Sequence, residues 1–465
     1  MAASGFVLAR LGWAVLAMAT GALLFCLWLA LGPHGRRRLG PPEARPEFGT
    51  LSWLAMLFAA GMGTGLVVWG VAEPVTHALH PPGGGGVSEA SARQAMVLTF
   101  LHWGLHAWAI YALAALVVGW FAFRAGRPAT VSAALAGLGT GGPARGLRWA
   151  AEIAGILAVV FGLAGTLAMG ARTVASGLPA VGLPPAAAEA LGPLVLLAIG
   201  LTALASAATP LGRGIRLLSD LNILLAIILM LAVFLLGPSA ELLARLGQGI
   251  RDYLAALPRL SVSLAPAPAA QAWARDWTLT YFLWWLAWGP FVGVFIARIS
   301  RGRSIREFLA GVVLVPAFGS FLWFAVLGGS GLALLLADPE GPIARAAAGE
   351  PTAALFTLLA GLPAGALLSA LALVLLGLFL VTSIDSAAYV LGMMASGGDP
   401  SPPVWLRLSW GLLLLLLGAA ILSVATVEVA RGLAILGALP YPLVLGAQAA
   451  GLVLALRSAE GDGKA

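Results

Sequence analysis

Long runs of apolar residues, separated by short loops rich in arginine, glycine and proline, make up most of the chain. Eleven of these runs are long enough to cross the roughly 30 Å hydrocarbon core of a bilayer as helices. They lie at about 6–32, 51–79, 94–123, 147–177, 187–207, 214–237, 272–298, 307–335, 364–395, 403–424 and 428–457. The pattern predicts an all-α polytopic membrane protein with eleven transmembrane helices.

Arginine is concentrated in every second loop. The clusters follow the first, third, fifth and seventh runs, at Arg36, Arg37, Arg38, Arg45, Arg124, Arg127, Arg145, Arg148, Arg213, Arg216, Arg298, Arg301, Arg303 and Arg306. Because basic residues are retained in cytoplasmic loops, this alternation predicts an N-terminus outside the cell and a C-terminus in the cytoplasm. The whole protein is expected in the cell membrane (inner or plasma membrane).

One predicted outer loop departs from this rule, because residues 239–270 contain Arg245, Arg251 and Arg259. Apolar residues recur among these arginines at helical spacing, at Leu242, Leu243, Leu246, Ile250 and Leu254. An amphipathic helix in the membrane interface, followed by a linker, is the simplest interpretation, since such helices place arginine on their polar face.

Composition excludes several classes of protein. The chain has 465 residues that are 60% hydrophobic and 10% charged, and its mean hydropathy of +0.98 is far above that of soluble domains. The net charge of +7 is explained by the basic loops, so nucleic-acid binding is not expected. A single cysteine, Cys26, excludes an intrachain disulfide. No P-loop, HExxH or nucleophile motif is present, and the chain is predicted not to be an enzyme.

Two helix breaks suggest an internal repeat. The run at 51–79 is interrupted by the glycines of 61–65, and the run at 272–298 by Gly289-Pro290. Equivalent breaks in two five-helix halves are typical of inverted-repeat transporters with a site at mid-membrane. Alternatively, the glycines only permit tight helix packing. The predicted domains are an N-terminal helix and basic loop (1–50), a first repeat (51–238), the interfacial helix and linker (239–270), a second repeat (271–457) and a short tail (458–465).

Aromatic residues gather in two of the runs. On a helix, Trp103, Trp108 and Tyr111 fall within one arc, and Trp285 and Trp288 lie one turn apart on another. The two walls could form a cage for a quaternary ammonium group, which binds to π faces because it has no N–H to donate. The alternative is an ordinary packing stripe.

Three segments resemble the betaine/choline/carnitine transporter (BCCT) family. They are GMGTGLVVWGVAEP at 61–74, HWGLHAWAIY at 102–111 and WWLAWGPFVGVFIARISRGR at 284–303, the last being similar to the family signature. The resemblance extends over nearly the whole chain. It implies two inverted five-helix repeats in the fold shared with neurotransmitter:sodium symporters, one extra N-terminal helix, and a homotrimer. The family usually has twelve helices, so its first helix is expected to be absent here.

The resemblance also implies a substrate site. Trp103, Trp108, Tyr111 and Trp285 would surround the onium group, with Trp288 on the cytoplasmic side of the pathway and Trp284 in packing. The glycine break, comprising Gly61, Met62, Gly63 and Gly65, would face the substrate's carboxylate, and freed backbone N–H groups suit that role.

By the same resemblance, Thr382 and Ser383, with carbonyls of Ala59, Met62 and Phe379, form a candidate Na⁺ site. The alternative, from the sequence pattern alone, is that the two hydroxyls donate hydrogen bonds to carbonyl oxygens of the preceding helical turn. Asp385, an intramembrane carboxylate, is a candidate for gating or ion handling, or else caps local polar groups. Family members that bind a second sodium have threonines where this chain has the apolar stretch 159–163. At most one Na⁺ is therefore expected.

These features predict a secondary active transporter that imports glycine betaine or a related quaternary-ammonium zwitterion, coupled to Na⁺ by alternating access. Gly65, where proton-coupled choline carriers have Asp, favours a zwitterion over choline; carnitine and dimethylsulfoniopropionate stay open. The alternatives are a sodium-independent exchanger, a proton-coupled carrier of choline or carnitine, and a non-transporting sensor. The expected partners are the small substrate and the lipid bilayer, with Na⁺ as coupling ion and no other cofactor.

Three polar residues within the apolar runs have a structural interpretation. His102 and His106 are expected to form hydrogen bonds between helices rather than to transfer protons. Glu73 precedes Pro74, and this pair is expected to end its helix, because proline cannot donate the next helical hydrogen bond.

Overall fold

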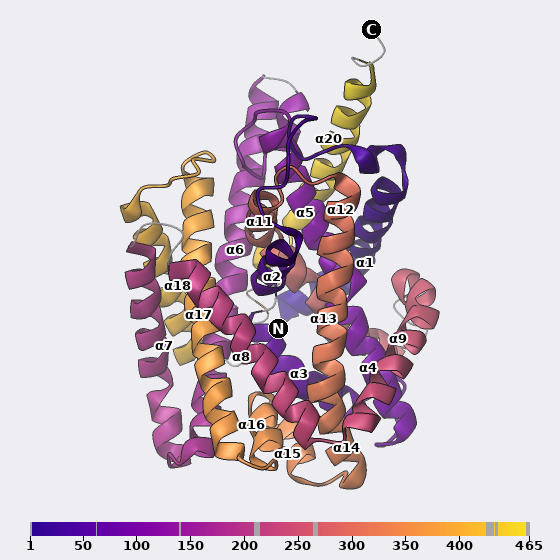
Figure 1. Cartoon of the computed structure of the whole chain (residues 1–465), viewed down its shortest axis with the longest axis vertical. Coiled ribbons are helices and arrows are strands. Elements are labelled where there is room, and N and C mark those ends of the chain that lie inside the picture. The colour runs from indigo at the N-terminus through magenta and orange to yellow at the C-terminus, as the bar shows by residue number, and fades with distance from the viewer. Residues whose placement is uncertain are drawn as a thin grey trace.

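The chain folds into long helices, most of which run along a common direction (Figure 1). The computed structural model describes residues 2–61, 63–138, 141–208, 214–263, 268–424, 432 and 436–461. Within these residues the regular structure is helical, and the only β-type pairing is an isolated bridge between Arg38 and Ser304. The all-α prediction is confirmed.

The first half of the chain contains helices α1 (Ala2–Leu31), α2 (Thr50–Gly61), α3 (Thr64–Leu79), α4 (Glu89–Trp103), α5 (Leu105–Phe123), α6 (Gly142–Gly177), α7 (Pro185–Ala208), α8 (Gly214–Leu236) and α9 (Ser239–Val262). The second half contains α10 (Pro268–Ala274), α11 (Thr280–Ile299), α12 (Ile305–Leu309), α13 (Val315–Trp323), α14 (Gly329–Ala337), α15 (Pro342–Gly349), α16 (Ala354–Ala360), α17 (Gly365–Ala395), α18 (Val404–Val424) and α20 (Tyr441–Gly461). Short 3₁₀ turns lie at Pro33–Arg36, Ala133–Leu138, Leu178–Val181 and Pro351–Ala353, and π-helical turns at Arg275–Leu279 (η4), Ala310–Leu314 (η5) and Phe324–Gly328 (η6).

Ten helical spans among the described residues are long and apolar enough to cross a membrane, and each corresponds to a predicted run. The remaining predicted run, 51–79, is divided between α2 and α3, which have 12 and 16 residues. Neither helix alone reaches the length of a membrane span. The total of eleven crossings therefore stays a prediction, as do the inverted repeat and the domain boundaries.

The helices at the surface expose leucine, whereas the central helices are buried. Leu201 of α7, Leu235 of α8 and Leu416 of α18 are 56%, 72% and 59% exposed. By contrast, nearly every side chain of α5 is buried. Apolar side chains on the outside and a packed centre are what a protein surrounded by lipid requires.

The two central helices, α5 and α11, pack against each other through small residues. A Cβ at Gly293 would lie only 3.0 Å from Cβ of Ala114 and 3.2 Å from the backbone nitrogen of Ala115. A similar contact lies one turn further on, where a Cβ at Gly119 would be 3.6 Å from Cβ of Ala297. Small residues at these positions let the two backbones approach closely, as in many membrane helix pairs.

The predicted helix break at Gly289-Pro290 is wrong. Helix α11 continues through both residues, with Pro290 buried inside it. Proline removes one helical hydrogen bond, and the surrounding packing tolerates this loss. Gly289 has a packing role instead, because a Cβ there would lie 2.8 Å from the ring of Tyr441 on α20. The break that was expected to match the glycine break of the first half is therefore not present at this position.

The predicted helix end at Glu73-Pro74 is also wrong, since α3 contains Pro74 and continues to Leu79. The proline ring is accommodated by η6, where a Cβ at Gly328 would lie 2.6 Å from Cγ of Pro74. The absence of a side chain at Gly328 thus makes room for the ring, and the helix is not interrupted.

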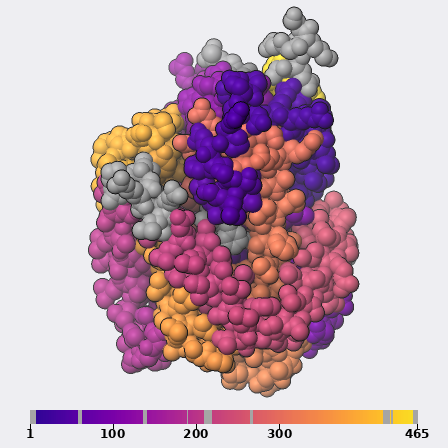
Figure 2. Space-filling view, in the orientation of Figure 1, coloured from indigo at the N-terminus to yellow at the C-terminus, as the bar shows by residue number. Residues whose placement is uncertain are grey.

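The predicted amphipathic helix at 239–270 corresponds to α9. It buries Leu242 and Tyr253 and leaves Leu243 and Leu254 more than half exposed. Figures 1 and 2 show α8 crossing the front of the bundle obliquely and α9 following on the right-hand side. Helix α9 packs on α4, where a Cβ at Gly249 would lie 3.0 Å from the ring of Phe100.

Two of the arginine clusters meet at the end of the molecule where the C-terminus lies (Figure 1). Arg38 Nη1 donates to the carbonyl oxygen of Gly302 at 2.8 Å, which joins the loop after α1 to the loop after α11. Arg37 Nη1 donates to the carbonyl oxygen of Leu456 on α20 at 2.9 Å. The ends of α1, α11 and α20 therefore lie on one side.

We expect Gly293→Ala to lower the thermal unfolding midpoint of the purified protein, because the added methyl group forces α5 and α11 apart. Overpacking of this kind costs about 1–3 kcal/mol. Gly377→Ala in α17 is the matched control, since a Cβ at Gly377 has no neighbour within 4 Å and helix propensity favours alanine. Equal midpoints for the two variants would show that the close approach does not limit stability.

Candidate functional site

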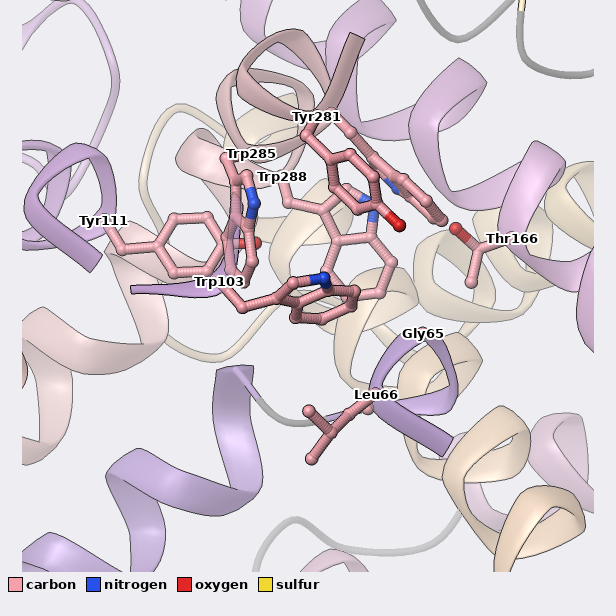
Figure 3. A pocket seen from close by; sticks show the side chains of 10 residues that line it. Gly65, Leu66, Trp103, Tyr111, Thr166, Tyr281, Trp285 and Trp288 are labelled. Atoms are coloured by element: carbon pink, nitrogen blue, oxygen red, sulfur yellow. The ribbon is translucent and has the colours of Figure 1, made fainter. Parts of the chain in front are cut away.

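A cavity lies beside the glycine break, at the N-terminal end of α3 (Figure 3). Ten residues line it: Gly63, Gly65, Leu66, Trp103, Tyr111, Thr166, Tyr281, Trp284, Trp285 and Trp288. They come from the residue before α3, from α3 itself and from α4, α5, α6 and α11. Aromatic rings form most of the wall, and Gly65 and Leu66 lie below them in the view of Figure 3.

Trp285 is the centre of the aromatic cluster. The centroid of its ring lies 4.9 Å from that of Tyr111 and 5.4 Å from that of Trp103, at interplanar angles of 64° and 87°. Trp108 lies 6.0 Å away at 51°. Edge-to-face and tilted arrangements such as these are favourable for aromatic pairs. The structure thus brings together the four residues predicted to surround an onium group.

These four residues are not equivalent. Trp108 is fully buried and contacts Trp285 and Tyr111, but it does not line the cavity. Conversely, Trp284, predicted to act in packing, stacks on Tyr281 and also lines the cavity. Tyr281 was missed altogether, although it precedes Trp285 by four residues and Trp288 by seven. That helical spacing was the signal that could have identified it.

Trp103 is separated from Trp108 and Tyr111 by a kink, so the single helical arc assumed for 94–123 is wrong. Helix α4 ends at Trp103 and α5 begins at Leu105. Gly104 is needed between them, because a Cβ there would lie 2.3 Å from the carbonyl oxygen of Phe100. The N–H of Leu105, freed by the kink, donates to the hydroxyl of Tyr253 on α9 at 3.3 Å. The kink directs Trp103 toward Trp285.

The glycine break is present. Helix α2 ends at Gly61, α3 begins at Thr64, and Gly63 has the extended conformation φ −105°, ψ −156°. Met62, a predicted ligand of both the substrate and Na⁺, lies outside the described residues. Gly63 and Gly65 line the cavity, and the first turn of α3 points its positive end there. Gly61 is the last residue of α2.

A second cavity adjoins the first. It is lined by Gly63, Ser219, Asn222, Trp288, Phe291, Val292, Phe295, Phe379, Thr382, Ser383 and Ser386. Gly63 and Trp288 line both cavities and therefore lie between them. Three of the five residues predicted to bind Na⁺, namely Phe379, Thr382 and Ser383, line this second cavity.

Two oxygens of the candidate Na⁺ site, both on α17, lie close together. Thr382 Oγ1 is 3.1 Å from the carbonyl oxygen of Phe379, and a Cβ at Gly63 would be 3.9 Å from Oγ of Ser383. Ala59 belongs to the last turn of α2, whose carbonyls have no helical partner further along. Thr382 Oγ1 also lies 3.0 Å from the carbonyl oxygen of Leu378, so its hydroxyl donates to the preceding helical turn, as the alternative interpretation of this residue predicts. It accepts from Asn222 Nδ2 at 3.3 Å.

Asp385 lies one turn beyond Thr382 but lines neither cavity. It is 2% exposed, and Oγ of Ser206 on α7 donates to its Oδ2. Arg407 of α18 is close enough to interact electrostatically with it. Asp385 therefore connects α17 to its neighbours, and its predicted role in gating is not tested by this arrangement.

The stretch 159–163 of α6 has no side-chain oxygen, as its sequence requires. Thr166 lies one turn further on and lines the first cavity, but its hydroxyl donates to the carbonyl oxygen of Gly162 at 3.0 Å. A Cβ at Gly162 would lie 3.4 Å from the ring of Trp288. This part of α6 is thus engaged in packing against α11.

The two histidines of the aromatic segment form hydrogen bonds between helices, as predicted. His106 Nε2 lies 3.1 Å from Oγ of Ser261 on α9 and 3.4 Å from Oγ1 of Thr20 on α1. His102 lies next to Glu73 of α3 and Thr278 of η4.

Comparison with known proteins identifies relatives along the whole chain. The family model for the betaine/carnitine/choline family transporters (BCCT) matches residues 1–461. The glycine betaine transporter OpuD of Bacillus subtilis (strain 168) is 39% identical over 449 residues, which cover 95% of this chain and 86% of OpuD. The osmo-dependent choline transporter BetT2 of Acinetobacter baylyi is 35% identical, covering 97% of this chain and 66% of BetT2. The high-affinity choline transport protein of Escherichia coli (strain K12) is 36% identical, over 96% of this chain and 66% of that protein.

Proposed function

Because the chain belongs to the betaine/carnitine/choline transporter family, we propose that it imports glycine betaine or a related onium zwitterion, coupled to Na⁺. The protein is a multi-pass membrane protein of a transporter family rather than an enzyme. The observation that supports the substrate class most directly is the ring of Trp285, with Trp103 and Tyr111 within 5.4 Å of it at the wall of a cavity. An onium group bound there would exchange its water for π faces.

The other side of the cavity suits a carboxylate. Gly63, Gly65 and Leu66 line it at the N-terminal end of α3, where a helix has partial positive charge. None of the described residues that line the cavity carries a side-chain carboxylate. A zwitterion would supply its own negative charge to this end, whereas choline has none. This asymmetry favours glycine betaine over choline for this chain.

Na⁺ coupling is supported by the oxygens around Thr382. Phe379 O, Thr382 Oγ1 and Ser383 Oγ are hard, neutral ligands on α17, and Ser383 lies next to the glycine break. We propose that one Na⁺ binds there, with Ala59 and Met62 contributing carbonyls. The alternating access that the family resemblance implies would expose the first cavity to one side and then, past Trp288, the second cavity to the other.

We further propose that the arginine-rich end of the molecule faces the cytoplasm, which puts the N-terminus outside and the C-terminus inside. The proximity of Arg37 to Leu456 and of Arg38 to Gly302 supports a common side for these loops. A homotrimer in the cell membrane follows from the family resemblance.

A sodium-independent exchanger is the second candidate function. Its support is the apolar stretch 159–163, together with the hydroxyl of Thr166, which bonds to its own helix. That arrangement leaves α6 without free oxygen ligands for a second ion, so all Na⁺ coupling would depend on the single site on α17.

Replacing Trp285 tests the onium cage. We expect Trp285→Leu to weaken glycine betaine binding by about 1–2 kcal/mol, because the cation–π contact is lost. Isothermal titration calorimetry on the purified protein measures this change. Trp405→Leu is the control, since Trp405 is 66% exposed on α18 and distant from the cavity in sequence. Unchanged affinity in Trp285→Leu would refute the role assigned to this ring.

Flux in proteoliposomes tests the coupling. An inward Na⁺ gradient is expected to drive glycine betaine accumulation, and an equal K⁺ gradient is not. Thr382→Val should raise the Na⁺ concentration needed for half-maximal uptake about tenfold, because one oxygen ligand is removed. Thr173→Val is the matched control, since its buried hydroxyl only bonds to Met169 O on α6. Counterflow that persists without Na⁺, with no accumulation, would select the exchanger.

Position 65 tests the choice between zwitterion and cation. A Cβ at Gly65 would lie 3.2 Å from Cη2 of Trp103, so a side chain introduced there would lie at the cavity wall. We expect Gly65→Asp to improve choline affinity relative to glycine betaine by about tenfold, through attraction of the cation and repulsion of the carboxylate. Gly65→Asn controls for size. Equal preferences in the two variants would exclude charge at position 65 as the determinant.

A further inference from the structure

A buried polar cluster lies behind the ring of Trp103. It consists of Glu73 and His77 on α3 and His102 on α4, and all three side chains are 0% exposed. Oε1 of Glu73 lies 2.7 Å from Nδ1 of His102 and 3.3 Å from Nε2 of His77. A buried carboxylate is costly unless it is paired, and the ion pairs of Glu73 among the described residues are with these two imidazoles.

The short distance between Glu73 and His102 indicates a hydrogen bond rather than two ligands of one metal ion. The three ligand atoms lie within 4.8 Å of one another, a grouping that could also hold a metal ion. However, two ligands of a tetrahedral metal, each about 2.0–2.1 Å from it, would be about 3.3 Å apart. The separation of 2.7 Å between Glu73 and His102 is too short for that geometry and suits a shared proton.

The cluster is connected directly to the cavity wall. The other oxygen of Glu73, Oε2, accepts a hydrogen bond from Nε1 of Trp103 at 2.7 Å. The carbonyl oxygen of His102 accepts one from Nε1 of Trp285 at 2.8 Å. The imidazole of His102 also stacks on the ring of Tyr281, with centroids 4.7 Å apart and planes 12° apart. Three lining rings are thus held by Glu73 and its partner His102.

Not every tryptophan near the cavity has a hydrogen-bond acceptor for its indole N–H. The buried Nε1 atoms of Trp108 and Trp288 have no hydrogen-bond partner among the described residues. The N–H of Trp103, by contrast, is fixed by a charged acceptor, which gives a stronger and shorter bond than a neutral one. Trp103 also follows directly on the His102 that Glu73 holds, and it ends α4 immediately before the kink at Gly104.

We propose that Glu73 is a positioning residue for onium binding, which holds the ring of Trp103 in place as its hydrogen-bond acceptor. The proposal rests on the proposed function, because it assumes that Trp103 contacts the substrate. Glu73 itself does not line the cavity and acts only through the indole N–H. Loss of the acceptor would leave a buried N–H unpaired and the ring free to turn away from Trp285.

Glutamine at this position is the informative conservative change. Its amide oxygen can accept from Trp103, and its NH₂ group can donate to Nδ1 of His102. His102 tolerates this exchange of roles, because Oγ1 of Thr278, 2.9 Å from its Nε2, can either donate or accept. Glu73→Gln therefore preserves the acceptor for Trp103 and removes only the charge, whereas Glu73→Ala removes the acceptor.

The test is a double-mutant cycle, with glycine betaine affinity measured by calorimetry on the full chain. Glu73→Ala is expected to weaken binding about tenfold, and Glu73→Gln by no more than about threefold. In a Trp103→Phe background, which lacks the N–H, Glu73→Ala should change the affinity by less than about twofold. Thr99→Val is the control on α4, because its hydroxyl bonds only to Ala95 O.

Three results would overturn the proposal. The first is an equal loss from Glu73→Ala with tryptophan and with phenylalanine at position 103, which would mean that Glu73 acts elsewhere. The second is a loss in Glu73→Gln as large as in Glu73→Ala, which would mean that the charge is required. The third is zinc bound stoichiometrically by the purified wild type, which would mean that the cluster holds a metal. Failure of the wild type to bind glycine betaine would instead refute the proposed function.

Discussion

The close approach of α5 and α11 is the constraint on which the candidate site depends. At Gly293 the backbones are so near that an added Cβ would lie 3.2 Å from the nitrogen of Ala115. In lipid there is no hydrophobic force between helices, so such packing of small residues supplies much of the attraction. The rings of Tyr111 and Trp285 are one to two turns away on the same helices, and their 4.9 Å separation is a consequence of the backbone contact. The large rings of Tyr111 and Trp285 can face each other at the cavity because small residues form the neighbouring contact between α5 and α11.

The second requirement is that interrupted helices recover their hydrogen bonds, since water is absent from the hydrocarbon region. The kink at Gly104 has a partner on another helix. The hydroxyl of Tyr253 accepts from the N–H of Leu105 after the kink at Gly104. In α3, Nε1 of Trp323 donates to the carbonyl oxygen of Leu66 next to the glycine break, and Gly70 leaves room for that ring. The amphipathic helix α9 is therefore part of the site's support as well as a surface element.

Much of this arrangement could be predicted from the sequence, because apolar runs and aromatic spacing are local signals. Ten of the spans and the glycine break follow from them. The gathering of Trp103, Tyr111 and Trp285 agrees with what the family resemblance implied. The predictions at Pro74 and Pro290 were wrong because the effect of a proline depends on what packs against it, here Gly328 and the surrounding helices. The kink at Gly104 was missed too, because only the folded chain shows that a Cβ there would lie 2.3 Å from the carbonyl oxygen of Phe100. The role proposed for Glu73 could not be inferred, since its partners His102 and Trp103 lie on another helix.

The geometry also bears on how ion and substrate binding could be linked. Gly63 lines both cavities and lies beside Ser383, so the same extended residue borders the proposed onium-zwitterion site and the proposed Na⁺ site. An ion that draws carbonyls of this segment toward α17 would fix the N–H groups on its other side. The substrate carboxylate would then bind to a backbone that is already ordered. Less of the binding free energy would be offset by the cost of ordering that backbone. Coupling of this kind is reciprocal, because a bound carboxylate would order the carbonyls for the ion by the same amount. Glycine at position 63 would serve both steps, since a Cβ there would lie 3.9 Å from Oγ of Ser383, one of the proposed ion ligands.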